Sequence, residues 1–216
     1  MKKLIPIKKL IYAAAILVSA VCSQASAQTL DCSALAGFNP STVVRVYDIS
    51  RYVKLDAAQQ KSLAKAIEKA DAKEVEMIKA ADGVLTTADS RKMEKTRDKM
   101  LAGILSTEQL EQYYRGIFDS EADAEGTGVA NRLQKKYNLT DQNWKFIRVA
   151  FYKIALDSRV INKMLSDRPA EAKKKIEQLR AEQLATIEAK GGIRVNPAGT
   201  TVTVVKPFDP NTLHRE

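Results

Sequence analysis

Apolar side chains recur every three or four residues over most of the chain, which is the period of an amphipathic helix. The strongest stripe lies between 140 and 165 and consists of Trp144, Ile147, Phe151, Ile154, Ala155, Ile161 and Leu165. A second stripe between 56 and 81 ends at Asp82-Gly83, and a third follows between 87 and 104. Because the turn between the second and third stripes is short, we expect these two helices to lie antiparallel as a hairpin.

Two other segments are less regular. Residues 40–53 are rich in β-branched side chains, which favours a strand, whereas Pro40 suits the first turn of a helix. We take the helix. Residues 121–137 are also expected to be helical, but broken or frayed at Gly126 and Gly128.

The period changes at the C-terminal end. A helix over 169–189 is expected to stop at Gly191-Gly192, and residues 193–195 and 200–205 then indicate two short strands around a type I turn at 196–199. An isolated hairpin is marginal in water, so we expect it to dock on the helical body or on a partner. The predicted fold class is all-α, with antiparallel long-helix hairpins and a short C-terminal β-hairpin.

This order of elements suggests a helical domain over 28–190 and a β-hairpin tail over 191–216. The second part of the helical domain repeats the sequence of a long helix and a returning helix. The domain is therefore interpreted as two diverged helical-hairpin halves, 40–118 and 121–190.

Three helix starts share a pattern of a leading Leu, a small oxygen-bearing cap and an amide three residues after the cap. They are Leu55-Asp56-Ala57-Ala58-Gln59, Leu105-Ser106-Thr107-Glu108-Gln109 and Leu139-Thr140-Asp141-Gln142-Asn143. In such a capping box the cap oxygen accepts from an N–H of the first turn, and the amide reaches back to the N–H of the cap. The Leu packs on the fourth helical residue, which is Leu110 in the second copy and Trp144 in the third. In the first copy this residue is Gln60, so the hydrophobic staple is incomplete there.

These boxes resemble the LTxxQ motif of the Spy/CpxP family, small envelope proteins that bind unfolded or misfolded clients and report on envelope stress. The likeness is best between Leu55 and Asn143; the chain has Asp56, Ser106 and Asn143 where the family usually has Thr, Thr and Gln. The resemblance implies an ATP-independent chaperone or a stress-sensing accessory protein. In Spy-like proteins a basic, partly apolar concave surface of a helical cradle dimer holds the client, so a homodimer is also implied.

The start of the chain has the layout of a secretory signal peptide, which we place at residues 1–27. Met1–Lys9 carries four lysines, the apolar stretch Leu10–Val21 follows, and Ala25-Ser26-Ala27 offers small residues for cleavage before Gln28. The apolar stretch is too short to span a bilayer comfortably. We therefore expect an exported, periplasmic protein with no transmembrane segment in its mature chain.

Cleavage leaves Cys32 as the single cysteine, because Cys22 departs with the leader. One cysteine cannot make an internal disulfide, so Cys32 is interpreted as an unpaired thiol or as a bond between subunits. A competing hypothesis lipidates Cys22, but Val21 is large for the position before a lipidated cysteine and Ser19 stands where Leu is usual.

Catalysis and nucleic-acid binding find little support. The mature chain keeps 31 basic and 26 acidic residues, a net charge of +5 that does not by itself indicate nucleic acid. His214 is the only histidine and lies two residues from the C-terminus, so no Ser/His/Asp or Cys/His arrangement can be assembled. Met93 and Met100 are seven apart, which is ordinary core spacing rather than a metal site. We expect no enzyme, no cofactor and no metal.

Two columns of basic residues are the sharper feature. The first basic column consists of Lys61, Lys65, Lys69 and Lys73, and the second of Arg91, Lys95 and Lys99. Like charges four residues apart cost an isolated helix about 0.2–0.5 kcal/mol per pair. Either nearby acids (Glu68, Asp71, Glu94, Asp98) make a mixed solvated face, or the columns attract acidic segments of an unfolded client beside apolar residues.

Two alternatives remain at this stage. The chain could be a non-catalytic structural protein of the envelope whose C-terminal hairpin docks on a partner by strand addition. A weaker alternative is an exported enzyme with a site built from dispersed carboxylates, which would require a compact acidic pocket.

Overall fold

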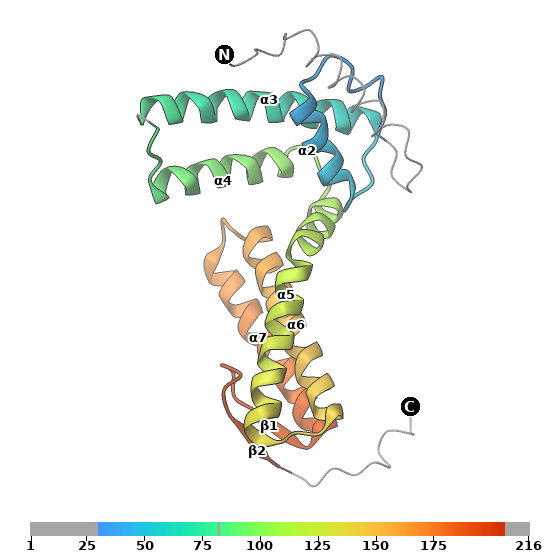
Figure 1. Ribbon diagram of the computed structural model, residues 1–216, viewed down its shortest axis with the longest axis vertical. Helices are drawn as coiled ribbons and strands as arrows, with labels where there is room; N and C mark the ends of the chain where they lie inside the picture. The colour runs from blue at the N-terminus through green and yellow to red at the C-terminus, as the bar shows by residue number, and fades with distance from the viewer. Residues whose placement is uncertain (1–29, 82, 206–216) are drawn as a thin grey trace, which may run out of the picture. The chain divides into compact units, whose positions relative to one another are not determined.

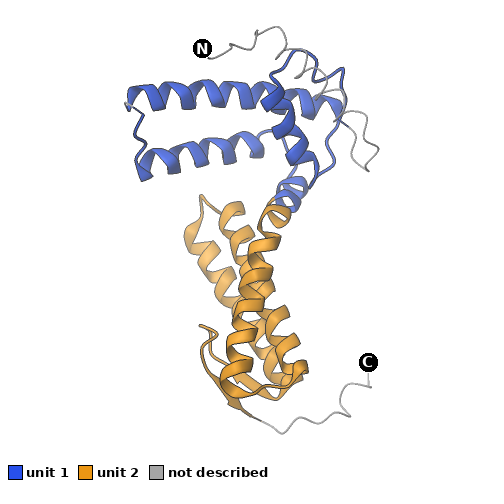
Figure 2. Cartoon of the chain, viewed as in Figure 1, with its two compact units in different colours: residues 1–113 blue, residues 114–216 orange. Residues whose placement is uncertain are grey.

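The computed structural model describes residues 30–81 and 83–205 (Figure 1). Helices account for 74% of the described residues, and six helices among them pack as antiparallel neighbours, followed by a two-strand antiparallel sheet. The predicted all-α fold class with its β-hairpin is therefore confirmed. The signal peptide, Cys22 and His214 lie outside the described residues. The chain forms two compact units, residues 1–113 and 114–216, which we describe separately (Figure 2).

The described part of unit 1 contains three complete helices and the start of a fourth. They are α2 (Pro40–Ser50), α3 (Ala57–Ala80), α4 (Thr87–Ala102) and the first turns of α5 (Thr107–Tyr137). Residues 40–50 are helical, as we predicted, because Pro40 occupies the first turn and Val43, Val46 and Ile49 form one buried stripe at helical spacing.

The core of unit 1 lies at one end of the α3–α4 hairpin. Its buried apolar side chains come from the leading segment (residues 30–39), α2, the connection between α2 and α3, the first half of α3 and the region around the α4–α5 turn. They include Leu30, Leu35, Val46, Val53, Leu63, Ile67, Leu101 and Leu105. The last buried residue of α3 is Ala70, and the buried residue of α4 is Leu101. No described residue between these two positions is buried.

Unit 2 is built from the rest of α5, α6 (Asp141–Met164), α7 (Pro169–Gly191) and the strands β1 (Ile193–Val195) and β2 (Val202–Val204). One apolar cluster joins all of these elements: Val129, Ala130, Leu133, Ile147, Ala150, Phe151, Ile187, Ile193 and Val195 are buried in it. As predicted, α7 ends at the glycine pair, where Gly192 takes the left-handed conformation with φ of 61°.

The expected break at Gly126 and Gly128 is wrong, since α5 runs unbroken from Thr107 to Tyr137. A Cβ at position 126 would lie 2.6 Å from the carbonyl oxygen of Arg148 and 2.7 Å from the backbone nitrogen of Tyr152. Glycine at 126 therefore permits the backbones of α5 and α6 to approach closely, and this packing outweighs the low helix propensity of glycine.

Polar pairs flank the close contact between α5 and α6. Arg115 Nη1 lies 2.6 Å from Asp157 Oδ1, and Tyr152 Oη donates to Asp119 Oδ1 over 2.6 Å. The Asp119 carboxylate, as acceptor of that bond, raises the pKa of the Tyr152 hydroxyl. These hydrogen bonds link α5 to α6 beside the close approach at Gly126.

The C-terminal hairpin docks on its own unit. Gly199 N donates to Asn196 O over 2.9 Å and closes the turn, while Ile193 and Val195 of β1 are buried in the apolar cluster. Docking on the helical body, one of the two outcomes expected for this tail, is confirmed.

Cys32 is disulfide-bonded in the structure of the full chain; the expectation of an unpaired thiol concerned the chain after cleavage, which lacks Cys22. Cys32 follows Asp31, whose carboxylate accepts from the Ser33 hydroxyl over 2.6 Å. That bond, with the backbone N–H groups of Ala34 and Ser33, lowers the pKa of Asp31.

Candidate functional site

The first two capping boxes form as predicted. The Asp56 carboxylate accepts from Gln59 N over 2.7 Å, and Gln59 Oε1 accepts from Asp56 N over 3.2 Å. In the second box Ser106 Oγ accepts from Gln109 N over 3.2 Å, and Gln109 Oε1 accepts from Ser106 N over 2.9 Å. Each box satisfies two helix-end N–H groups that would otherwise lack a partner.

The amides of these two boxes also bond to each other. Gln59 Nε2 donates to Gln109 Oε1 over 2.8 Å, and Gln109 Nε2 donates to Gln59 Oε1 over 3.1 Å. Each amide additionally donates to the carbonyl two residues before the cap of the other box: Gln59 to Ile104 O, 3.2 Å, and Gln109 to Lys54 O, 2.7 Å. This exchange ties the start of α3 to the start of α5, and it uses both donors of each amide within the protein.

Gln60 replaces the missing hydrophobic staple of the first box with polar contacts. Its Nε2 donates to Leu55 O over 3.1 Å, and its Oε1 accepts from Asp31 N over 2.8 Å. The residue is only 3% exposed. Gln60 therefore fastens the leading segment to α3, a role that the sequence pattern did not indicate.

The third box is half formed. Thr140 Oγ1 accepts from Asn143 N over 3.2 Å, as expected. The return bond is missing, and the buried Asn143 Oδ1 has no hydrogen-bond partner. Asn143 Oδ1 lies beside Gly191 instead, where a Cβ would be 2.8 Å from it. The expected reciprocal box at Asn143 is therefore wrong.

One further box was missed by the sequence analysis. Thr86 caps α4: its hydroxyl accepts from Asp89 N over 3.2 Å, and Asp89 Oδ2 accepts from Thr86 N over 3.1 Å. The spacing of a Thr and an acid three residues later could have identified it. The Thr86 hydroxyl, donating to Asp89 Oδ2 over 2.6 Å, is the main cause that lowers the pKa of this carboxyl.

All seven members of the basic columns are exposed. The side of α3 that faces α4 is marked by Glu74, which binds Arg97 of α4 through two hydrogen bonds of 2.9 and 2.7 Å. Because successive helical residues turn by about 100°, the first basic column lies roughly 100–180° from Glu74 around α3. The second column lies roughly 120–160° from Arg97 around α4. Both columns point away from the neighbouring helix, so they do not meet at the contact between α3 and α4.

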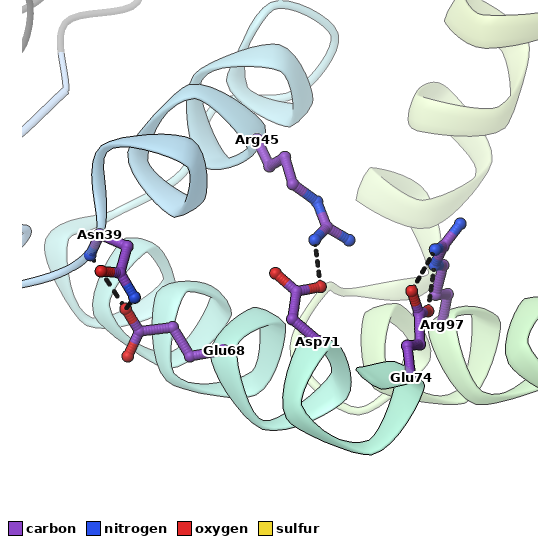
Figure 3. A network of polar contacts seen from close by, with 6 residues as sticks. All are labelled: Asn39, Arg45, Glu68, Asp71, Glu74 and Arg97. Atoms are coloured by element: carbon purple, nitrogen blue, oxygen red, sulfur yellow. Dashed lines mark hydrogen bonds and ion pairs between the residues drawn. The ribbon is translucent and has the colours of Figure 1, made fainter. Parts of the chain in front are cut away.

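The acids expected to offset the first column are engaged elsewhere (Figure 3). Glu68 Oε1 accepts from the backbone N and from the side-chain Nδ2 of Asn39, both over 2.9 Å. Asp71 pairs with Arg45 of α2. Among the described residues no ion pair is recorded for the lysines of the first column, so its charges stand in solvent without a paired acid.

The far end of the α3–α4 hairpin carries an apolar surface that the sequence analysis did not single out. We call it the hairpin tip; its large apolar side chains are Val75, Met77, Ile78, Val84, Leu85 and Met93. Val75, Ile78 and Val84 are 48%, 38% and 73% exposed, and the other three are half-buried. Val75 and Ile78 fall within the apolar stripe predicted between 56 and 81, and Met93 falls within the one predicted between 87 and 104. The helical period alone could not show that the described elements leave this end without a third layer.

Residues 30–81 and 83–205 contain neither a metal-binding cluster nor a membrane-spanning helix. No group of three His, Cys, Asp or Glu side chains there could hold a metal ion. Likewise, no helix in this part of the chain is long and apolar enough to cross a bilayer.

Comparison of the chain with family models, with curated proteins and with solved structures gives no match.

Proposed function

We propose that this chain is an exported, ATP-independent chaperone-like protein of the Spy/CpxP type, which holds unfolded periplasmic proteins on its α3–α4 hairpin. The observation that carries the proposal is the hairpin tip, where Val75, Ile78 and Val84 are exposed and no described residue between Ala70 and Leu101 is buried. Exposed apolar surface gathered on one element is a common feature of surfaces that bind other polypeptides.

The chemistry of the hairpin suits weak binding of many sequences. Val, Ile, Leu and Met side chains offer non-directional apolar contact, and the flexible methionines Met77 and Met93 can adapt to different client side chains. Such binding needs neither a preformed pocket nor a cofactor. It favours segments that are apolar and still unfolded, because folded proteins bury most of theirs.

The basic columns supply long-range attraction. Their positive charges stand in solvent on the outer sides of the same hairpin, where they raise the encounter rate with acidic chains and lose this effect in salt. In this proposal the tip holds the client and the columns bring it there. The capping boxes have a structural role, because the side-chain N–H groups of Gln59 and Gln109 donate to each other's amide oxygen and to backbone carbonyls.

An aggregation assay tests the proposal. The chain from Gln28 onward is mixed with two unrelated unfolding substrates, and light scattering is followed with wild type and with the triple variant Val75→Ser, Ile78→Ser and Val84→Ser. We expect wild type to suppress aggregation of both substrates and the variant to lose most of this activity.

A matched control changes valines of similar exposure elsewhere, Val44→Ser and Val149→Ser, which are 49% and 46% exposed in wild type. This control is expected to keep full activity. Loss of activity in the control to the same degree as in the tip variant, or no suppression by wild type, would contradict the proposal.

A further inference from the structure

Within the described part of the chain, the outer strand of the C-terminal hairpin has one edge without a pairing strand, which we call the open edge. The inner strand is anchored: Ile193 and Val195 are buried, and Arg194 binds Glu188 of α7 through hydrogen bonds of 2.8 and 2.6 Å. In contrast, Thr203 and Val204 of β2 are exposed, Val204 by 70%. Strand β2 pairs with β1 on one side, and no other described strand lies beside it.

The register shows which backbone groups reach this edge. Val205 N donates to Gly192 O over 2.9 Å, and Asn196 N donates to Thr201 O over 3.1 Å. Hydrogen-bonded pairs alternate along an antiparallel ladder, so the N–H and C=O groups of Thr203 also face β1. The backbone groups of Val202 and Val204 therefore point away from β1, and among the described residues no partner is recorded for them.

The edge lacks the features that usually prevent pairing with another strand. Residues 200–205 contain no charged residue and no proline, and the register with β1 contains no bulge. An uncharged edge also means that two copies of this strand would meet without repulsion between side chains on the strand itself.

We propose that β2 is a self-association site, where two copies pair antiparallel about a two-fold axis at Thr203 and form one four-stranded sheet. In this register Val202 of one copy lies opposite Val204 of the other. The outward N–H and C=O groups of each of these residues then exchange hydrogen bonds with the opposite residue, so every donor and acceptor of the open edge is paired.

The side chains support the same register. Val202 and Val204 lie on the face of the sheet that carries Ile193 and Val195, since directly opposite residues share a face. The exposed Val204 would be covered by Val202 of the second copy, and the two Thr203 side chains would meet as a cross-strand pair. A second copy is thus an occupant whose hydrogen-bonding pattern and apolar side chains both match the edge.

Cysteine cross-linking tests the register. Residues directly opposite in a non-hydrogen-bonded antiparallel pair have Cα atoms about 4.5 Å apart, which a disulfide can span. Thr203→Cys is therefore expected to give a covalent dimer under mild oxidation. Thr201→Cys and Val205→Cys should each cross-link poorly alone but form a mixed dimer together, because 201 lies opposite 205 of the second copy.

Charge variants give a second, reversible readout by sedimentation. Thr203→Lys and Thr203→Glu should each shift the chain toward monomer, and mixing the two should restore dimer; Ala185→Lys, an exposed change on α7, should leave association unchanged. The proposal is overturned if Thr203→Cys cross-links no faster than Thr201→Cys, or if the wild-type chain stays monomeric at every concentration. It does not depend on the proposed chaperone function, because neither readout involves a client.

Discussion

The side chains of Gln59 and Gln109 lie 50 positions apart and hydrogen-bond to each other in both directions, over 2.8 and 3.1 Å. Each also caps its own helix, so a single side chain joins local and long-range structure. Removing one amide would leave the other without part of its hydrogen bonding.

We predict that Gln59→Ala and Gln109→Ala each lower the free energy of unfolding of the chain by about 2 kcal/mol, from the lost cap and the unpaired partner. The double variant should cost less than the sum of the two, because the second change removes an amide that has already lost its bonds to the first. Chemical denaturation of all four proteins measures this coupling, and Gln112→Ala, an exposed amide on α5, serves as the control. Strict additivity would refute the mutual pairing.

Substitutions in the half-formed third box should affect stability differently from those at Gln59 and Gln109. Asn143 Oδ1 is buried without a partner, so Asn143→Ala removes an unsatisfied group and should cost clearly less than Gln59→Ala. Thr140→Ala, which removes the cap itself, should cost about 1 kcal/mol. Equal losses at Asn143 and Gln59, measured by denaturation, would mean that the asparagine amide makes a bond absent from this structure.

Replacing two glycines of α5 by alanine should change the free energy of unfolding in opposite directions. Gly126→Ala would force a Cβ against backbone atoms of α6, which cannot move aside like a side chain, and should destabilise the chain by roughly 1–3 kcal/mol or more. Gly128→Ala would meet only the end of the Arg132 side chain, at 3.5 Å, and should stabilise the chain by about 0.5–1 kcal/mol through helix propensity. Thermal unfolding of the two variants distinguishes a glycine needed for packing from one that only weakens the helix. A higher stability of both variants would contradict the close contact of α5 and α6.

The cap of α4 should be visible in a pH titration. The Thr86 hydroxyl and backbone N–H lower the pKa of Asp89 in the folded protein. The stabilisation is therefore present above the pKa that Asp89 has when unfolded, and it is lost as the pH falls through the folded value. Thr86→Val should raise the pKa of Asp89 toward its ordinary value, as followed by NMR, whereas the neighbouring control Thr87→Val should not.

The basic columns should affect how fast clients bind. Replacing Lys61, Lys65, Lys69 and Lys73 by Gln is expected to slow association with an acidic unfolded client at low salt and to flatten its salt dependence. The control removes the same charge from unit 2 at four exposed lysines, Lys135, Lys145, Lys153 and Lys174. Stopped-flow association at several salt concentrations compares the two variants, and equal slowing in both would assign the effect to net charge alone.

Local chemistry explains how much of the fold the sequence could predict. The caps at Asp56, Ser106 and Thr140 were readable because a capping box lies within four residues of the chain. The pairing of Gln59 with Gln109 could not be predicted, because the sequence around each helix start does not indicate that the two starts meet. The break expected at Gly126 failed for a related reason: glycine weakens a helix by itself, yet here it permits the approach of α6.

The sequence predicted only part of the candidate site. The spacing of the lysines correctly placed the basic columns on exposed faces, but the period of one helix does not reveal which side meets its neighbour. The hairpin tip could not be recognised, because Val75 and Ile78 have ordinary core spacing and only the packing shows that they are left uncovered.

The central claim is that unfolded chains bind at the hairpin tip, and site-specific photo-cross-linking measures this contact directly. A photoreactive amino acid is placed at position 84, at position 78 or, as a control of similar exposure on α6, at position 149, and each protein is irradiated with an unfolded client. We predict strong client adducts from positions 84 and 78 that weaken when the client is allowed to fold, and few adducts from position 149. Equal adducts from all three positions, or adducts that persist with folded client, would contradict the claim.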